Sequence, residues 1–302
     1  MDFMAGASRV WAVKSIFEGD LSPVAVRGGA EMKDITTMMC DLIDTYEPVW
    51  RQTSQIHPNI AYVLGGLCDI TEKRKYRDWK GQYEEVIVDF DHSHALDYLD
   101  SEYRYCELKI KQKGVTPVFA TITTMDLQNW NIHRYTQPSN PRRRRKTDYL
   151  LFQSEYPKMQ RNLNNIIISA NNMIRNINKK NKVMTPDLAR YVMIPREGSI
   201  PGEDMKYKIR TGKSHLHDGC HPSLSIKREW NFHMSAVKTV NRLQLSSPEA
   251  VKIIDEASHH RCDLTGVPIE KSTFKFKLSD FNTRSYSSNY SSNYSRHLSR
   301  RY

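Results

Sequence analysis

The feature that most constrains the fold is an alternation of short apolar runs with longer amphipathic segments over about the first 245 residues. The runs VAV at 24–26, NIAYVLGG at 59–66 and VTPVFATITT at 115–124 are short and rich in apolar or β-branched residues, which is typical of buried strands. Between and after these runs, apolar side chains recur every three to four residues, which predicts helices. This alternation predicts a mainly parallel sheet that is covered by helices on both faces.

Four segments have the spacing of amphipathic helices. They span roughly residues 32–46, 96–110, 159–177 and 230–237. The second ends before Gly114, and glycine is a common residue just past a helix end. We expect the apolar stripes of these helices to form the core. Functional residues should instead follow the strands, because ligands of parallel sheets bind at the carboxyl ends of the strands.

Composition indicates an intracellular globular protein. The chain has 302 residues, of which 39% are hydrophobic and 26% charged, so it can form one large domain with a buried core. No segment reaches the roughly 18 consecutive apolar residues of a membrane helix. The N-terminal MDFMAGASRVW lacks the basic start of a signal peptide. The five cysteines are scattered and odd in number, which favours a reducing compartment, cytoplasmic or nuclear, over a disulfide framework.

The net charge of +11 is unevenly distributed. One basic cluster is the run Arg142, Arg143, Arg144, Arg145 and Lys146. A second lies near the C-terminus, where residues 279–302 form a low-complexity Ser/Tyr/Arg tail that we expect to be disordered. Clustered basic charge favours polyanions such as nucleic acid, and the alternative is a solvated loop with a solubilising tail. We therefore divide the chain into a folded domain at 1–245, an extension at 246–278 and the tail.

The motif HLHDGCHPS at 215–223 contains the residue types that most directly suggest a catalytic or metal-binding site. Asp218 and His221 are three residues apart, with His215 and His217 just upstream. Three interpretations are open: a catalytic Asp–His pair, a corner of a metal site that uses the three histidines, or a polar loop that caps the next helix. The carboxylate or thiol spacing that would complete a metal site is absent, so we predict no metal or other cofactor.

Four short motifs follow the predicted strands in a particular order. They are Gly6-Ala7-Ser8, Gly28-Gly29, Gly65-Gly66-Leu67-Cys68-Asp69 and Asp218-Gly219-Cys220-His221. Over about residues 3–243, they resemble the sequence blocks of the SGNH, or GDSL-like, hydrolases. That family has Gly-Asp-Ser after the first strand, Gly after the second, Gly-x-Asn-Asp after the third and Asp-x-x-His before the last helix. The resemblance implies a three-layer α/β/α sandwich with a flavodoxin-like parallel sheet.

The resemblance also implies roles for individual residues. Ser8 corresponds to the nucleophile, His221 to the base that takes its proton and Asp218 to the residue that orients the imidazole. The oxyanion hole would be formed by the backbone of Ser8, the backbone of Gly28 or Gly29, and the side chain of Cys68. The implied activity is hydrolysis of a small ester whose acyl group the sequence does not specify. The lack of a membrane-length apolar segment predicts that no membrane partner is involved.

Two residues depart from the family pattern. Ala7 stands in place of the Asp of Gly-Asp-Ser, which is not a triad member. Cys68 stands in place of the oxyanion Asn. A thiol is a weak donor, and loss of one oxyanion donor costs about 3–4 kcal/mol. We expect Asp69, which follows, to cap the helix after it.

The substitution at Cys68 leaves two alternatives open. One is a catalytically weak or inactive scaffold that binds nucleic acid or serves assembly. Such a protein could be encoded by a mobile element, because esterase-like domains occur in proteins of some retrotransposons. The other is a role for Cys68 as a thiol nucleophile.

Overall fold

The central sheet has four parallel strands in the order β2–β1–β3–β6. The computed structural model describes residues 1–18, 22–53, 58–78, 81–89, 91–136, 154–195, 207–209 and 215–244. The strands are β1 (Asp2–Gly6), β2 (Val24–Val26), β3 (Ile60–Leu64) and β6 (Thr116–Phe119). In the register, Ala5 of β1 pairs with Ala25 on one side and Val63 on the other. This strand order is that of a flavodoxin-like sheet, so the predicted fold class is confirmed.

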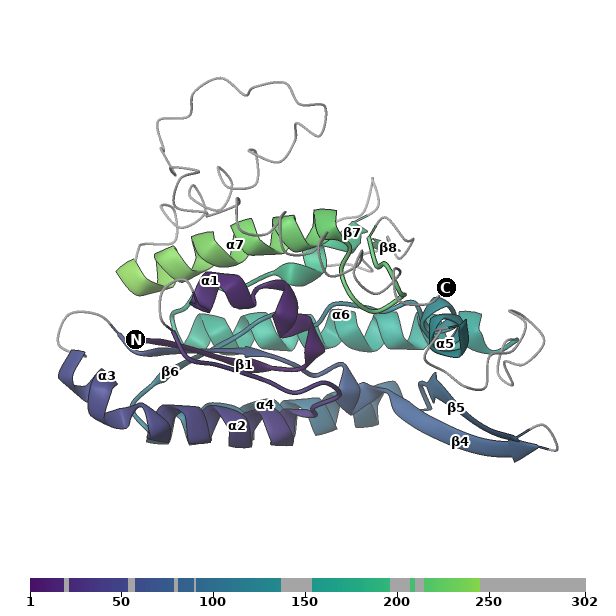
Figure 1. The fold of residues 1–302 in the computed structure, drawn as a ribbon, viewed down its shortest axis with the longest axis horizontal. Helices are drawn as coiled ribbons and strands as arrows, with labels where there is room; N and C mark the ends of the chain where they lie inside the picture. The colour runs from purple at the N-terminus through teal and green to yellow at the C-terminus, as the bar shows by residue number, and fades with distance from the viewer. Residues whose placement is uncertain are drawn as a thin grey trace, which may run out of the picture. The chain divides into compact units, whose positions relative to one another are not determined.

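Helices cover both faces of the sheet (Figure 1). One face packs against α2 (Met32–Thr45), α4 (His92–Gln112) and α6 (Tyr156–Lys180). The other packs against the 3₁₀ helix η1 (Ser8–Ala12), α1 (Lys14–Glu18) and α7 (Leu224–Leu243). Side chains alternate between the faces of a strand. Phe3 and Ala5 therefore join the first core and Met4 the second, which completes the three layers.

The remaining elements connect or extend these layers. They are α3 (Glu47–Thr53), η2 (Cys68–Ile70), the antiparallel pair β4 (Glu72–Asp78) and β5 (Gly81–Ile87), α5 (Leu127–Thr136), η3 (Leu188–Tyr191), and the antiparallel pair β7 (Met193–Pro195) and β8 (Tyr207–Ile209). The sequence did not predict β4 and β5, because their residues EKRKYRD and GQYEEVI are mostly charged or polar and show no apolar alternation.

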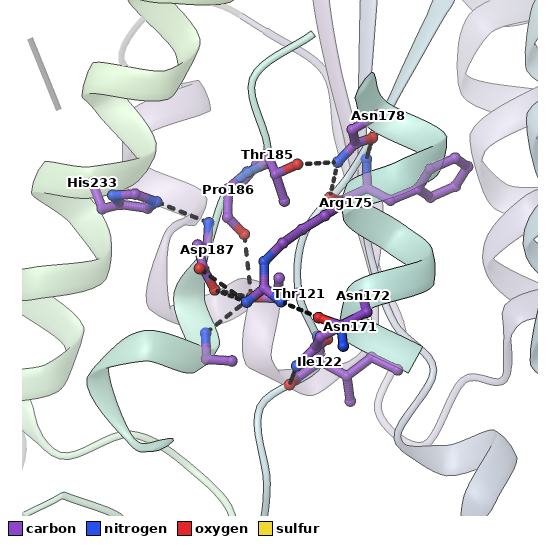
Figure 2. Close-up of polar contacts among 12 residues, drawn as sticks. Thr121, Ile122, Asn171, Asn172, Arg175, Asn178, Thr185, Pro186, Asp187 and His233 are labelled. Atoms are coloured by element: carbon purple, nitrogen blue, oxygen red, sulfur yellow. Dashed lines mark hydrogen bonds and ion pairs between the residues drawn. The ribbon is translucent and has the colours of Figure 1, made fainter. Parts of the chain in front are cut away.

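Asparagines of α6 bind the chain at and after β6 (Figure 2). The amide of Asn178 pairs with the N–H and C=O of Phe119 at 3.0 and 2.7 Å. The amide of Asn171 pairs in the same way with Ile122 at 2.7 and 2.9 Å. Asn171 and Asn178 are seven residues apart, which in a helix is a rise of about 10.5 Å. Phe119 and Ile122 are three residues apart, which in an extended chain is about 10 Å, so the two amides match the spacing of the two backbone residues. The strand predicted at 115–124 is shorter in the structure, because β6 pairs with β3 only up to Phe119, and beyond it Asn171 holds Ile122.

Several predictions concern membrane spans, disulfide bonds and the basic segments. In the described ranges, no helix is long and apolar enough to cross a membrane. The four cysteines in those ranges are free thiols. The basic run at 142–146, the extension at 246–278 and the tail at 279–302 lie outside the described residues, so the nucleic-acid and disorder hypotheses stay predictions.

Candidate active site

The site begins at the carboxyl end of β1, where the chain enters η1. Gly6 is the last residue of β1, and a Cβ at this position would lie 2.2 Å from the carbonyl oxygen of Leu64 and 2.6 Å from a methyl of Val10. A larger residue would push η1 away from the end of β3. Glycine therefore allows Ser8, the first residue of η1, to sit close above the sheet.

Ser8, His221 and Asp218 form one hydrogen-bonded chain. His221 Nε2 lies 3.0 Å from Ser8 Oγ, and His221 Nδ1 lies 2.6 Å from Asp218 Oδ2. The other carboxylate oxygen of Asp218 accepts from the backbone N–H groups of Cys220 at 2.8 Å and His221 at 2.6 Å. The fold thus brings together two motifs that are 213 positions apart in the sequence.

The environment of Asp218 determines which nitrogen of His221 carries a proton. Burial alone would raise the pKa of the Asp218 carboxyl. Hydrogen bonds from the His221 ring and from two backbone amides outweigh this effect and hold the pKa well below its usual range. An ionised carboxylate can only accept, so Nδ1 is the donor in this pair. Nε2 then directs its lone pair at the Ser8 hydroxyl, as a general base requires.

The loop that carries Asp218 and His221 is held against α5. Gly219 has a φ of +90°, and a Cβ there would lie 2.5 Å from the backbone nitrogen of Trp130. Its carbonyl accepts from the N–H of Asp126 at 2.7 Å. The Trp130 ring meets the His221 ring edge-on, with centroids 5.6 Å apart. A glycine is therefore needed at 219, because both the close approach and the backbone angle exclude a side chain.

The three interpretations of residues 215–223 can now be compared. The N-cap of α7 is Ser223, whose side chain accepts a backbone N–H, so the helix is not capped by Asp218 or His221. The potential ligand atoms of His217, Asp218 and His221 lie within 4.8 Å of one another, whereas His215 is not part of that group. This group could hold a metal ion. A metal would compete with the bond between Asp218 and His221.

The predicted oxyanion donors lie after β1, β2 and β3. Ser8 opens η1, and the first N–H groups of a helix have no intrahelical acceptor. Gly28 and Gly29 are exposed just after β2. In the described part of the chain, the backbone N–H groups of Ser8, Gly28 and Gly29 make no hydrogen bond to the protein.

Cys68 lies in η2, directly after the loop that follows β3. Burial, together with the negative charge of neighbouring Asp69, raises the pKa of the Cys68 thiol to about 11. The thiol therefore keeps its proton near neutral pH, where it can act as a weak hydrogen-bond donor. A thiolate nucleophile requires a lowered pKa, so this environment does not support nucleophilic attack by Cys68.

The prediction for Asp69 is wrong. Its carboxylate accepts from the N–H of Met32 at 2.9 and 3.1 Å, and Met32 is the first residue of α2, which precedes Asp69 in the chain. No helix follows directly, because η2 leads into the β4–β5 hairpin. Asp69 therefore links the loop of Cys68 to the segment that follows Gly28 and Gly29.

Arg9 and Trp130 belong to the site but were not identified from the sequence. Arg9 is buried beside Ser8, and its guanidinium bonds to the residue that precedes His221. Its one signal in the sequence is a single charge within the apolar stretch AGASRVWAV. Trp130 left no signal, because the short helix α5 has no clear apolar periodicity.

Comparisons with known proteins identify similar solved structures only. No protein-family model matches the chain, and neither does any curated protein sequence. A GDSL-like lipase from Bacteroides thetaiotaomicron is similar in structure with a TM-score of 0.42 and 9% identity, over 79% of this chain and 85% of the lipase chain. An acetyl xylan esterase has a TM-score of 0.41 and 13% identity, over 80% of this chain and 100% of the esterase chain.

Proposed function

We propose that this protein is a serine hydrolase of small esters, in which Ser8 is the nucleophile, His221 the general base and Asp218 the residue that orients His221. The observation that carries the proposal is the continuous chain from Ser8 Oγ to His221 Nε2 at 3.0 Å and from His221 Nδ1 to Asp218 at 2.6 Å. A nucleophile, a base and an orienting group within hydrogen-bond reach of one another are what activation of a serine hydroxyl requires.

The reaction proceeds in two halves. His221 Nε2 takes the Ser8 proton while Oγ bonds to the ester carbonyl carbon, and the carbonyl electron pair moves onto oxygen. When the tetrahedral intermediate collapses, the alcohol leaves with the proton from His221, and Ser8 remains acylated. Water then attacks the acyl group with His221 again as base, which releases the carboxylic acid and restores the hydroxyl. Ionised Asp218 stabilises the imidazolium in both halves.

The negative oxygen of each intermediate would be bound by the free backbone N–H groups of Ser8 and of Gly28 or Gly29. Cys68 would add its thiol proton as a third, weaker donor. Preorganised donors of this kind are worth about 3–4 kcal/mol each when strong, so the weak thiol predicts a slow hydrolase rather than an inactive one.

A serine-reactive fluorophosphonate and a short-chain nitrophenyl ester test the proposal. The wild type should hydrolyse the ester and be labelled, and mass spectrometry should place the label on Ser8. Ser8→Ala should lose both reactions and keep the wild-type circular dichroism spectrum. Ser101→Ala, at an exposed position of α4, is the matched control and should retain both. A folded wild type that neither hydrolyses the ester nor reacts at Ser8 would refute the proposal.

A further inference from the structure

Arg9 connects the nucleophile's helix to two other segments of the site. Its side chain is buried, with 7% of the residue exposed. The guanidinium Nε donates to the carbonyl of Cys220 at 3.1 Å, and Nη2 donates to the carbonyl of Thr124 at 2.8 Å. Nη1 bonds to both the carbonyl and the hydroxyl oxygen of Thr123. The residue next to Ser8 thus joins η1 to the chain after β6 and to the residue before His221.

The partners of Arg9 are neutral acceptors. In the part of the chain that the structure describes, Arg9 makes no ion pair. Its partners are three carbonyls, one hydroxyl and the thiol of Cys220, whose sulfur lies 3.6 Å from Nη2. Burying a charged group is costly unless its donors are satisfied. A planar guanidinium satisfies several acceptors in one fixed geometry, which the single ammonium of lysine cannot do.

A single peptide group connects Arg9 to the Asp218–His221 pair. The carbonyl of the peptide between Cys220 and His221 accepts from Arg9 Nε. The N–H of the same peptide donates to Asp218 Oδ1 at 2.6 Å. Because a peptide group is planar and rigid, these two bonds together fix where the backbone of His221 lies relative to η1.

We infer that Arg9 is a positioning residue, which keeps His221 Nε2 within hydrogen-bonding distance of Ser8 by holding the Cys220–His221 peptide. This inference rests on the function proposed above. A misplacement of about 1 Å can cost about 100-fold in rate, so small shifts of this peptide matter for catalysis. A purely structural arginine would change stability and leave the turnover of the folded enzyme intact.

Arg9→Lys and Arg9→Ala test the inference, with Arg175→Ala as the matched control. Arg175 also joins separate segments, since it bonds from α6 to Asp187 at 3.0 Å, and it shares no partner with Arg9. For the nitrophenyl ester, both Arg9 variants should lose about 10- to 100-fold in kcat with KM changed less than about threefold. Arg175→Ala should lower Tm and keep kcat. Methylguanidinium, but not methylammonium, should restore part of kcat to Arg9→Ala.

Proton NMR of the His221 Nδ1–H group provides a readout that does not require activity. The wild type should show a slowly exchanging downfield resonance from its bond to Asp218. Arg175→Ala should retain the resonance, and the Arg9 variants should lose or shift it. A resonance unchanged in Arg9→Lys and Arg9→Ala, whatever their kcat, would overturn the inference. A wild type that lacks the downfield resonance would also overturn the inference. A wild type that shows the resonance but neither hydrolyses nor labels would refute the proposed function alone.

Discussion

In the proposed mechanism, the side chain of Cys68 determines how strong the oxyanion hole can be. The family that the sequence resembles has an asparagine amide at this position, whereas this chain has a thiol. The pKa of that thiol is raised to about 11, so the group is neutral and able to donate. It remains a weak donor, because a sulfur-bound hydrogen makes poor hydrogen bonds. In the proposed mechanism, position 68 would therefore limit the rate without preventing the reaction.

If the proposed mechanism holds, replacing Cys68 with asparagine should raise the rate of ester hydrolysis. An amide N–H is a stronger donor than a thiol, and one good oxyanion donor is worth about 100- to 1,000-fold in kcat. We therefore expect Cys68→Asn to raise kcat toward a short-chain ester with little change in KM, measured by steady-state kinetics at neutral pH. Cys68→Ala is the control and should be no faster than wild type. A folded Cys68→Asn enzyme with unchanged kcat would mean that position 68 does not contact the oxyanion.

Helices in this fold are attached through paired amide contacts as well as through apolar packing. On α5, α6 and α7, buried asparagines each bind both the N–H and the C=O of one distant residue. The pairs are Asn131 with Val86, Asn171 with Ile122, Asn178 with Phe119 and Asn241 with Met184. A carboxamide has one acceptor and two donors, so it can replace the neighbouring strand that a backbone segment would otherwise need. Each pair satisfies polar backbone groups that would be costly to bury alone.

Loss of one such amide should destabilise the domain. Asn171→Ala would leave the N–H and C=O of Ile122 without their partner in a buried setting, at a cost of about 2–4 kcal/mol in the free energy of unfolding. Urea unfolding followed by circular dichroism measures this difference. Asn176→Ala, at an exposed position of the same helix, should stay within about 0.5 kcal/mol of wild type. Equal effects of the two substitutions would contradict the role of the amide pair.

For the molecule as a whole, Asp69 couples stability to pH. Burial raises the pKa of its carboxyl to about 7, and the nearby Glu31 acts in the same direction, while the bond from the N–H of Met32 opposes the shift. The folded state therefore holds a proton that the unfolded chain has lost above about pH 4. Stability from this group is greatest below the unfolded pKa and falls as pH rises toward the folded pKa, by at most about 1.4 kcal/mol per pH unit.

Asp69→Asn should remove this pH dependence. Asparagine keeps an oxygen that can accept from Met32 but does not titrate. The variant should gain free energy of unfolding relative to wild type as pH rises from about 4 to 7, by up to about 1.4 kcal/mol per pH unit. Urea titrations at several pH values give this difference directly. Parallel stability curves for the two proteins would show that Asp69 titrates normally in the folded state.

Much of the fold could be predicted because its signals are local. Apolar runs and three-to-four spacing located the strands β2, β3 and β6 and the helices α2, α4, α6 and α7, whereas β1 was indicated only by the Gly6-Ala7-Ser8 motif. The hairpin β4–β5 and the helix α5 lacked such patterns, since their residues are largely polar. The partner of Asp69 could not be predicted either, because its carboxylate binds a backbone group 37 residues earlier in the chain.

The sequence alone determined that Ser8, Gly28, Gly29 and Cys68 follow strands and that the Asp218–His221 motif precedes the last helix, because strand and helix ends are local features. Only the tertiary structure decided that Ser8 and His221 lie 3.0 Å apart across 213 positions. It also decided that Asp218 is ionised, that the Cys68 thiol keeps its proton and that Arg9 holds the histidine loop. The physical reason is that a pKa or a hydrogen bond depends on burial and on neighbours that folding alone brings together.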